Sequence, residues 1–127
     1  MTESPDCYEN QYARFWIADG ILFFIYKENV CIDRASAQQI VSDRIHFQNE
    51  KSYPILCDIR TISCADKVGR DYLAQSGSVF TKAVALLTNQ QVSLTISSFY
   101  LEISKPAVPT QLFIVQQEAI AFLQNYV

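Results

Sequence analysis

Apolar residues along this chain alternate between short runs typical of strands and longer spacings typical of helices. Near the amino terminus, Tyr12–Ile17 and Ile21–Tyr26 are rich in aromatic and branched side chains, which favours two strands. Asp19-Gly20 lies between them, a dipeptide favoured in tight hairpin turns because glycine accepts a positive φ. The pattern predicts a hairpin. Because Ile21–Tyr26 is apolar at every position, we expect both faces of this strand to be covered.

Helical spacing of apolar residues follows the hairpin and recurs three more times. Asp33 is an N-cap candidate for the first helix and Asp66 for a shorter second helix. Thr88-Asn89 opens the third helix, and a fourth begins at about Gln116, where Val115 cannot act as a cap. The expected inward positions are Ala37, Ile40, Val41 and Ile45, then Val68, Tyr72 and Leu73, then Val92, Ile96, Phe99, Tyr100 and Ile103, and finally Ala119, Phe122, Leu123 and Tyr126. The outer face of the first helix comprises Arg34, Gln38, Asp43 and Gln48.

Three further apolar stretches predict strands, at Tyr53–Cys57, Ala83–Leu87 and Gln111–Phe113. The resulting order is β-β-α-β-α-β-α-β-α. Alternation after the hairpin requires crossover connections, so the order predicts an α/β fold with a mostly parallel mixed sheet and an N-terminal hairpin. In a chain of 127 residues, we expect residues 1–10 to be a loose lead-in and residues 11–127 to form a single domain.

Charged residues are sparse in this sequence. They make up 18% of the chain, below the roughly 25% usual for a soluble domain, which suggests that a second copy or a ligand covers part of the surface. Leu94 and Leu101 lie off the main stripe of the third helix and favour the same interpretation, so a homodimer is the expected assembly. The net charge is −3 and no Lys/Arg run is present, which argues against nucleic acid as the main partner.

The amino-terminal residues indicate a cytoplasmic protein without a membrane span. Residues 1–10 are polar and acidic, and they lack the basic and apolar regions of a signal peptide. The longest apolar run, Ile21–Tyr26, is far too short to cross a bilayer.

Cysteine and histidine are too scattered to predict a metal site. The cysteines are Cys7, Cys31, Cys57 and Cys64. None forms a CxxC pair and His46 is the only histidine, so no metal or cofactor is expected, and without an export signal the cysteines are expected as free thiols. Cys64 lacks a base that would activate it as a nucleophile, and the three glycines form no phosphate-binding loop. The sequence therefore argues against an enzyme.

The densest group of charges follows the strand that ends at Asp58. It comprises Asp58, Arg60, Asp66, Lys67 and Arg70. Strand tips of this kind are where open α/β folds place their sites. In one interpretation, Arg60, Lys67 and Arg70 hold an anion, helped by the amides at the start of the helix. In the other, Asp66 is only a helix cap and Asp58 ties down the loop through backbone amides or Arg70.

The element order and this stretch together resemble the STAS family, which includes bacterial anti-sigma factor antagonists, and the related lobe of lipid-binding CRAL-TRIO proteins. In STAS domains an apolar strand ends in Asp, and Asp-Ser-Ser/Thr-Gly follows at a helix start. Here the strand ends at Asp58, and Asp66-Lys67-Val68-Gly69 stands at the position of that motif. Lys67 and Val68 replace the two hydroxyl residues, which include the phosphorylation site of the family. The resemblance therefore implies the fold without the phosphoryl switch.

This resemblance implies a non-enzymatic, STAS-like protein-interaction or regulatory module of the kind found in small bacterial proteins, many of which have no assigned function. Such a module would present Asp58–Arg70 and the following helix to a protein partner. The alternative is a binding module for a small apolar or anionic ligand, as the CRAL-TRIO resemblance implies. A carrier of that kind needs an apolar cavity of roughly 300 Å³ or more, and a solid core would exclude it.

Overall fold

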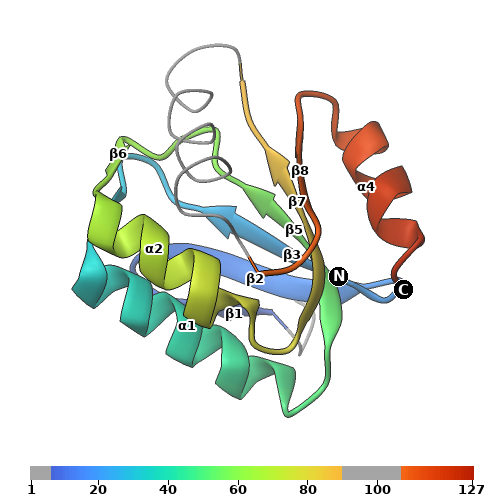
Figure 1. The fold of residues 1–127 in the computed structure, drawn as a ribbon, viewed down its shortest axis with the longest axis horizontal. Helices are drawn as coiled ribbons and strands as arrows, with labels where there is room; N and C mark the ends of the chain where they lie inside the picture. Colours follow the sequence, from blue (N-terminus) through green and yellow to red (C-terminus); the bar gives the residue numbers. More distant parts are fainter. Residues whose placement is uncertain (1–6, 90–106) are drawn as a thin grey trace.

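The computed structural model describes residues 7–89 and 107–127. In this part of the chain, a six-stranded sheet has the spatial order β1-β2-β3-β5-β7-β8 (Figure 1). The strands are β1 (Tyr8–Glu9), β2 (Ala13–Ala18), β3 (Ile21–Tyr26), β5 (Tyr53–Asp58), β7 (Thr81–Leu87) and β8 (Thr110–Phe113). β2 runs antiparallel to both of its neighbours, β1 and β3, whereas β3, β5, β7 and β8 are parallel. This sheet confirms the predicted fold class.

Helices lie on both faces of the sheet. α1 (Arg34–Gln48) and α2 (Lys67–Gln75) pack side by side on one face, and α4 (Gln116–Gln124) lies on the other (Figure 1). Each face has its own apolar core. Under α1 and α2 the core includes Phe15, Leu22, Phe24 and Ile40, and under α4 it includes Ile21, Leu56, Leu87 and Leu123. None of these helices combines the length and apolarity that crossing a membrane requires.

The predicted turn and helix caps are present. Asp19 and Gly20 have φ angles of 53° and 80°, and a two-residue hairpin turn of the I′ type needs both to be positive. The Asp33 carboxylate accepts the Ser36 amide at 2.8 Å, and the Ser36 hydroxyl accepts the Asp33 amide at 2.9 Å. The bond from the Ser36 amide holds the pKa of Asp33 below its usual value. Asp66 caps α2 in the same manner, accepting the Gly69 amide at 2.7 Å. These local signals are confirmed.

Three short strands have no counterpart in the predicted order. β1 falls within the expected lead-in, and β4 (Cys31–Ile32) pairs with β6 (Cys64–Ala65) in a separate two-stranded parallel sheet. A strand of two residues has no periodicity, so the apolar pattern cannot identify it. A 3-10 turn, η1 (Ser76–Ser78), follows α2. The predicted third helix, with Leu94 and Leu101, lies outside the described residues.

Two helical side chains point opposite to the prediction. Gln48 was expected on the outer face of α1 but is only 1% exposed, and its amide donates to the carbonyls of Lys51 and Phe80 at 2.9 and 2.8 Å. Val68 was expected to point inward on α2 but is 54% exposed. α2 instead buries small residues such as Gly69, which allows its backbone to approach β4 closely.

Candidate functional site

The five charged residues identified in the sequence divide into two groups. Asp58 ends β5 and binds Arg60, which donates from Nη2 at 2.7 Å, from Nε at 2.9 Å and from its backbone amide at 3.1 Å. Asp66, Lys67 and Arg70 lie at the start of α2. The backbone amide that was expected to bind Asp58 is therefore found. The charged partner of Asp58 is Arg60, however, and not Arg70.

Asp58 and Arg60 line a polar groove of about 510 Å³. Asp58 is in register with Leu87, which belongs to the core under α4, so the groove opens on the α4 side of the sheet. The other charged residues of the groove are Glu9, Arg14, Lys27 and Glu28. Three acidic and three basic side chains thus share this groove. The Asp58 carboxylate also raises the pKa of Arg60 by accepting its hydrogen bonds. Balanced charges give the groove little net attraction for an anion.

The cations at the start of α2 are also engaged with the protein. Lys67 Nζ lies 2.7 Å from a carboxylate oxygen of Asp71, and the Arg70 guanidinium donates to the Ala65 carbonyl. Asp66 already accepts the Gly69 amide. Because each of these charged groups binds another group of the protein, the arrangement favours a structural role for the charges over the anion site considered from the sequence.

The loop between the two groups is tied to the segment around β4. The amides of Ser63 and Asp66 donate to the carbonyls of Val30 and Ile32, each at 2.9 Å, and the Asn29 amide donates to the Thr61 carbonyl at 3.0 Å. Along the two segments, these hydrogen bonds lie both before and after the β4–β6 pair. Backbone hydrogen bonds of the protein itself therefore hold the loop against the β4 segment.

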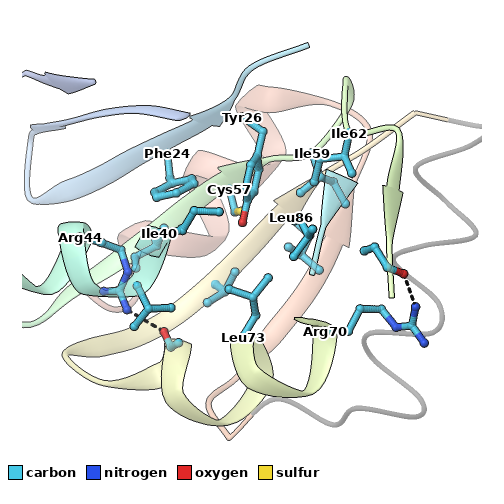
Figure 2. Close-up of a pocket in the computed structure, with 16 residues that line it drawn as sticks. Phe24, Tyr26, Ile40, Arg44, Cys57, Ile59, Ile62, Arg70, Leu73 and Leu86 are labelled. Carbon is cyan, nitrogen blue, oxygen red and sulfur yellow. Dashed lines mark hydrogen bonds between the residues drawn. The ribbon is translucent and has the colours of Figure 1, made fainter. Parts of the chain in front are cut away.

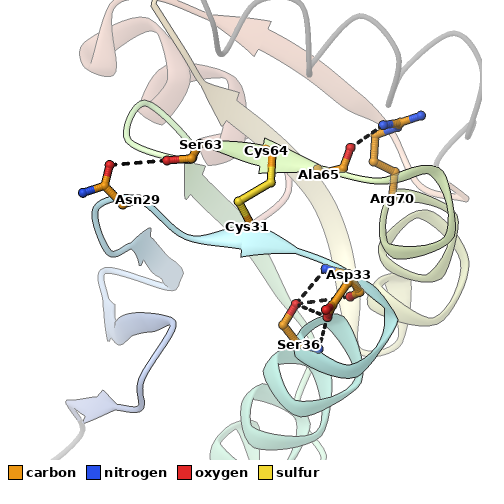
Figure 3. The surroundings of a disulfide bond; sticks show 8 residues. All are labelled: Asn29, Cys31, Asp33, Ser36, Ser63, Cys64, Ala65 and Arg70. Carbon is orange, nitrogen blue, oxygen red and sulfur yellow. Dashed lines mark hydrogen bonds between the residues drawn. A yellow bond between two sulfur atoms is a disulfide. The ribbon is translucent and has the colours of Figure 1, made fainter.

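A disulfide between Cys31 and Cys64 joins the same two segments (Figure 3). The expectation of free thiols is wrong for this pair and stands only for Cys7 and Cys57. The two cysteines are 33 positions apart in sequence, yet their Cα atoms are 4.5 Å apart because β4 and β6 place them in register. Cys64 is therefore not available as the thiol nucleophile considered from the sequence.

An apolar cavity of about 90 Å³ lies between the sheet and the α1–α2 layer. Figure 2 shows Ile40 and Leu73, from the two helices, facing Phe24 and Leu86, from the sheet. The cavity is smaller than the roughly 300 Å³ expected of a carrier for a drug-sized molecule, but the core here is not solid. No spacing in the sequence could locate it, because it depends on how well side chains from distant elements fill the space.

Arg44 forms part of the cavity wall and was not identified in the sequence. It is 4% exposed and donates to the carbonyls of Gly77 and Val79 at 2.8 and 3.3 Å, as well as to the Gln48 side chain. Its position four residues after Ile40 is the signal that could have placed it on the inner face. The bonds of Arg44 join the end of α1 to the turn before β7.

Cys57 also lines the cavity, and burial, followed by the charge of Asp58, raises the pKa of its thiol to about 12. It is therefore a neutral thiol at ordinary pH. Within residues 7–89 and 107–127, no three His, Cys, Asp or Glu side chains gather as metal ligands would.

Comparison with known proteins identifies a matching family and a similar fold. The family model of a domain of unknown function, DUF7793, matches residues 15–127. In structure, the chain is similar to an uncharacterised protein of the DUF3478 family from Shewanella loihica PV-4, which has a SpoIIAA-like fold. The TM-score is 0.55 at 12% identity, over 91% of this chain and 98% of the other. No curated protein matches the sequence. The structural likeness confirms the STAS-like fold expected from the sequence.

Proposed function

This chain belongs to the DUF7793 family, and we propose that it is a non-enzymatic, STAS-like module that binds a protein partner. One observation carries the proposal: Val68, in the first turn of α2, exposes 54% of its surface at the end of a firmly held loop. We call residues 60–71 the loop–helix surface. It contains the charged residues identified in the sequence except Asp58, which supports it from β5.

The loop–helix surface has the layout of a small interface. Lys67 and Asp71 form an ion pair beside Val68, which gives an apolar centre and a polar rim. The Asp66 cap and the bonds to the β4 segment fix the backbone before any partner arrives. A fixed surface binds with a smaller loss of conformational entropy than a loop that must order on contact.

The same surface supports binding that does not depend on phosphorylation. Lys67 and Val68 stand where the STAS motif has its hydroxyl residues, and neither can accept a phosphoryl group.

A cytoplasmic location and a homodimer are also part of the proposal. The homodimer is supported by Trp16 and Phe23, half-buried aromatic residues that stack with centroids 5.6 Å apart. Sedimentation equilibrium measures this state, and a monomer at every concentration would contradict it.

Replacing Val68 with aspartate should abolish partner capture without unfolding the chain. A buried interface with an apolar centre cannot accept an unpaired carboxylate, and we expect at least about a hundredfold loss of affinity, or roughly 2.7 kcal/mol. Quantitative affinity purification with the immobilised chain, followed by mass spectrometry, identifies the proteins whose recovery falls.

Val79→Asp is the matched control for this experiment. Val79 is 45% exposed and precedes β7, beyond the other end of α2. A specific partner is lost with Val68→Asp and retained with Val79→Asp. If every captured protein remains bound to the Val68 variant, the loop–helix surface is not the interface.

The cavity favours a second candidate function, the binding of a small apolar molecule. Its walls are mainly aliphatic and aromatic, and 90 Å³ suits a molecule of a few carbon atoms. Arg44 and Arg70 also line it, at opposite ends in Figure 2, so a carboxylate on such a molecule would meet at most one of the two guanidinium groups. Because the cavity is small, this candidate function covers only smaller ligands than those of the carrier expected from the CRAL-TRIO resemblance.

Titration with 1-butanol and butyrate should distinguish an apolar site from an anionic one. We expect 1-butanol to shift the methyl NMR signals of Ile62, Leu73 and Leu86 saturably, with a roughly millimolar Kd, because so few atoms contact the walls. Leu73→Phe, which fills the cavity, should weaken the shift. Tighter binding of butyrate would assign an anionic ligand. The absence of saturation with both compounds would exclude this function.

A further inference from the structure

The Cys31–Cys64 disulfide joins the starts of two helices (Figure 3). Each cysteine stands two residues before an N-cap, Cys31 before Asp33 of α1 and Cys64 before Asp66 of α2. The two segments run parallel and in register, so the bond connects equivalent points. It therefore clamps the beginning of α1 to the beginning of α2.

The next register pair lies against the cavity. Ile32 and Ala65 follow the two cysteines, pair with each other, and line the cavity together with Ile59 and Ile62 of the loop. Gly69 lies so near that a Cβ atom there would be 3.0 Å from Ile32. Separation of β4 from β6 would therefore loosen both the cavity wall and the start of α2.

Two features favour a reversible bond over a permanent one. Both cysteines are exposed, and exposed disulfides are the ones that thiols reach and reduce most readily. The segments are also held by the hydrogen bonds from the Ser63 and Asp66 amides, and by the core residues Val30, Ile32 and Ile62 beside the cysteines, none of which involves the sulfur atoms. Loss of the bond should therefore loosen this segment while the fold persists.

We propose that Cys31–Cys64 is a reversible redox site that controls the loop–helix surface and the adjoining cavity wall. The reductant is a dithiol. One of its thiolates attacks a cysteine sulfur, breaks the S–S bond and releases the other cysteine as a thiolate, which takes up a proton. The second thiolate of the reductant then attacks the reductant sulfur of this mixed disulfide, breaks its S–S bond and releases the first cysteine as a thiolate, which also takes up a proton. Two electrons and two protons pass to Cys31 and Cys64, and the reductant leaves as its own disulfide.

This inference rests on the proposed function for its biological consequence, since it names the regulation of the same surface. The oxidised form presents a rigid loop–helix surface, and the reduced form presents a loosened one. The redox step itself involves only the disulfide and the backbone around it, so it can be measured without any partner.

Hydrogen exchange of the full chain, with the disulfide intact and after reduction by dithiothreitol, tests the proposal. Reduction is verified by thiol labelling: Cys7 reacts in both states, and Cys31 and Cys64 react only after reduction. Cys57 is half-buried and reacts slowly in both states, because its raised pKa keeps the thiol protonated. We expect the Ser63 and Asp66 amides to exchange at least about tenfold faster after reduction. The Thr88 amide, which donates to the Phe113 carbonyl in the main sheet, should be unchanged.

The double variant Cys31→Ser/Cys64→Ser should show the faster exchange with or without reductant, whereas Cys7→Ser should respond as the native chain does. Unchanged exchange at Ser63 and Asp66 after full reduction overturns the proposal. Faster hydrogen exchange throughout the sheet also overturns it, because the disulfide then stabilises the whole domain and not only the loop. Failure of the partner interface is detected separately, by retention of partners on the Val68→Asp variant.

Discussion

Replacing Gln48 with leucine is expected to lower the free energy of unfolding by about 3 kcal/mol, although leucine is apolar and of similar size. Gln48 is 1% exposed and bonds on both sides, since its amide donates to the Lys51 and Phe80 carbonyls and its oxygen accepts from Arg44. Leucine would leave the Lys51 carbonyl without this donor and would remove one acceptor from a buried guanidinium. Buried polar groups that lose a partner pay their desolvation cost without compensation.

Chemical denaturation of four chains measures this effect: the native chain, Gln48→Leu, Arg44→Met and the double variant. We expect the double variant to lose less stability than the sum of the losses of the two single variants, by about 1–2 kcal/mol. Each single substitution already breaks the hydrogen bond between Arg44 and Gln48, so the sum counts this loss twice. Arg34→Met is the matched control, since Arg34 is exposed on the same helix and should change stability by less than about 0.5 kcal/mol. Strict additivity would show that Gln48 and Arg44 act separately.

Replacing Gly69 with alanine is expected to cost about 1–2 kcal/mol, even though alanine favours a helix by roughly 1 kcal/mol. A Cβ atom at this position would lie 3.0 Å from the Ile32 carbonyl oxygen and 3.1 Å from the Asp33 carbonyl carbon. Both are backbone atoms, one in β4 and one at the N-cap of α1, and they cannot move aside as a flexible side chain can. α2 would have to shift away from β4, which also displaces Val68 on the proposed interface.

Gly77→Ala is the control for this substitution. A Cβ atom at Gly77 would meet only side-chain carbons at 3.8 Å, which is ordinary contact. We expect a change smaller than about 1 kcal/mol, with stabilisation favoured because alanine restricts the unfolded chain. Thermal unfolding of the two variants compares the positions directly. A Gly69 variant as stable as the Gly77 variant would mean that α2 can move off β4 at no cost.

Gly69 also explains part of the resemblance on which the fold was predicted. The sequence matched the STAS motif at Asp66 and Gly69 and departed from it at Lys67 and Val68. In the structure, Asp66 caps α2 and Gly69 allows the close approach to β4, whereas Lys67 and Val68 point to solvent. The matching residues are therefore those that build the helix start. The departing residues are those a partner would contact.

Interactions between residues close in sequence determine most of the order of strands and helices. Asp33 and Asp66 cap their helices, Asp19-Gly20 forms the hairpin turn, and the apolar runs form the strands of the main sheet. Each of these signals acts between residues that are close in sequence, so periodicity and capping rules can detect it. The class of the fold then follows from the alternation of strands and helices.

The candidate site depended on contacts between residues far apart in sequence. The β4–β6 pair brought Cys31 to Cys64, a separation that no local pattern spans. Gln48 and Arg44 turned inward because carbonyls near β7 accept their hydrogen bonds. Val68 turned outward because Gly69 packs on β4. The sequence by itself determined the longer strands and the helices of the described residues, their order, and the absence of a phosphorylatable hydroxyl at the motif. Only the tertiary structure decided the disulfide, the cavity and the exposed centre of the loop–helix surface, since each arises from the packing of separate elements against one another.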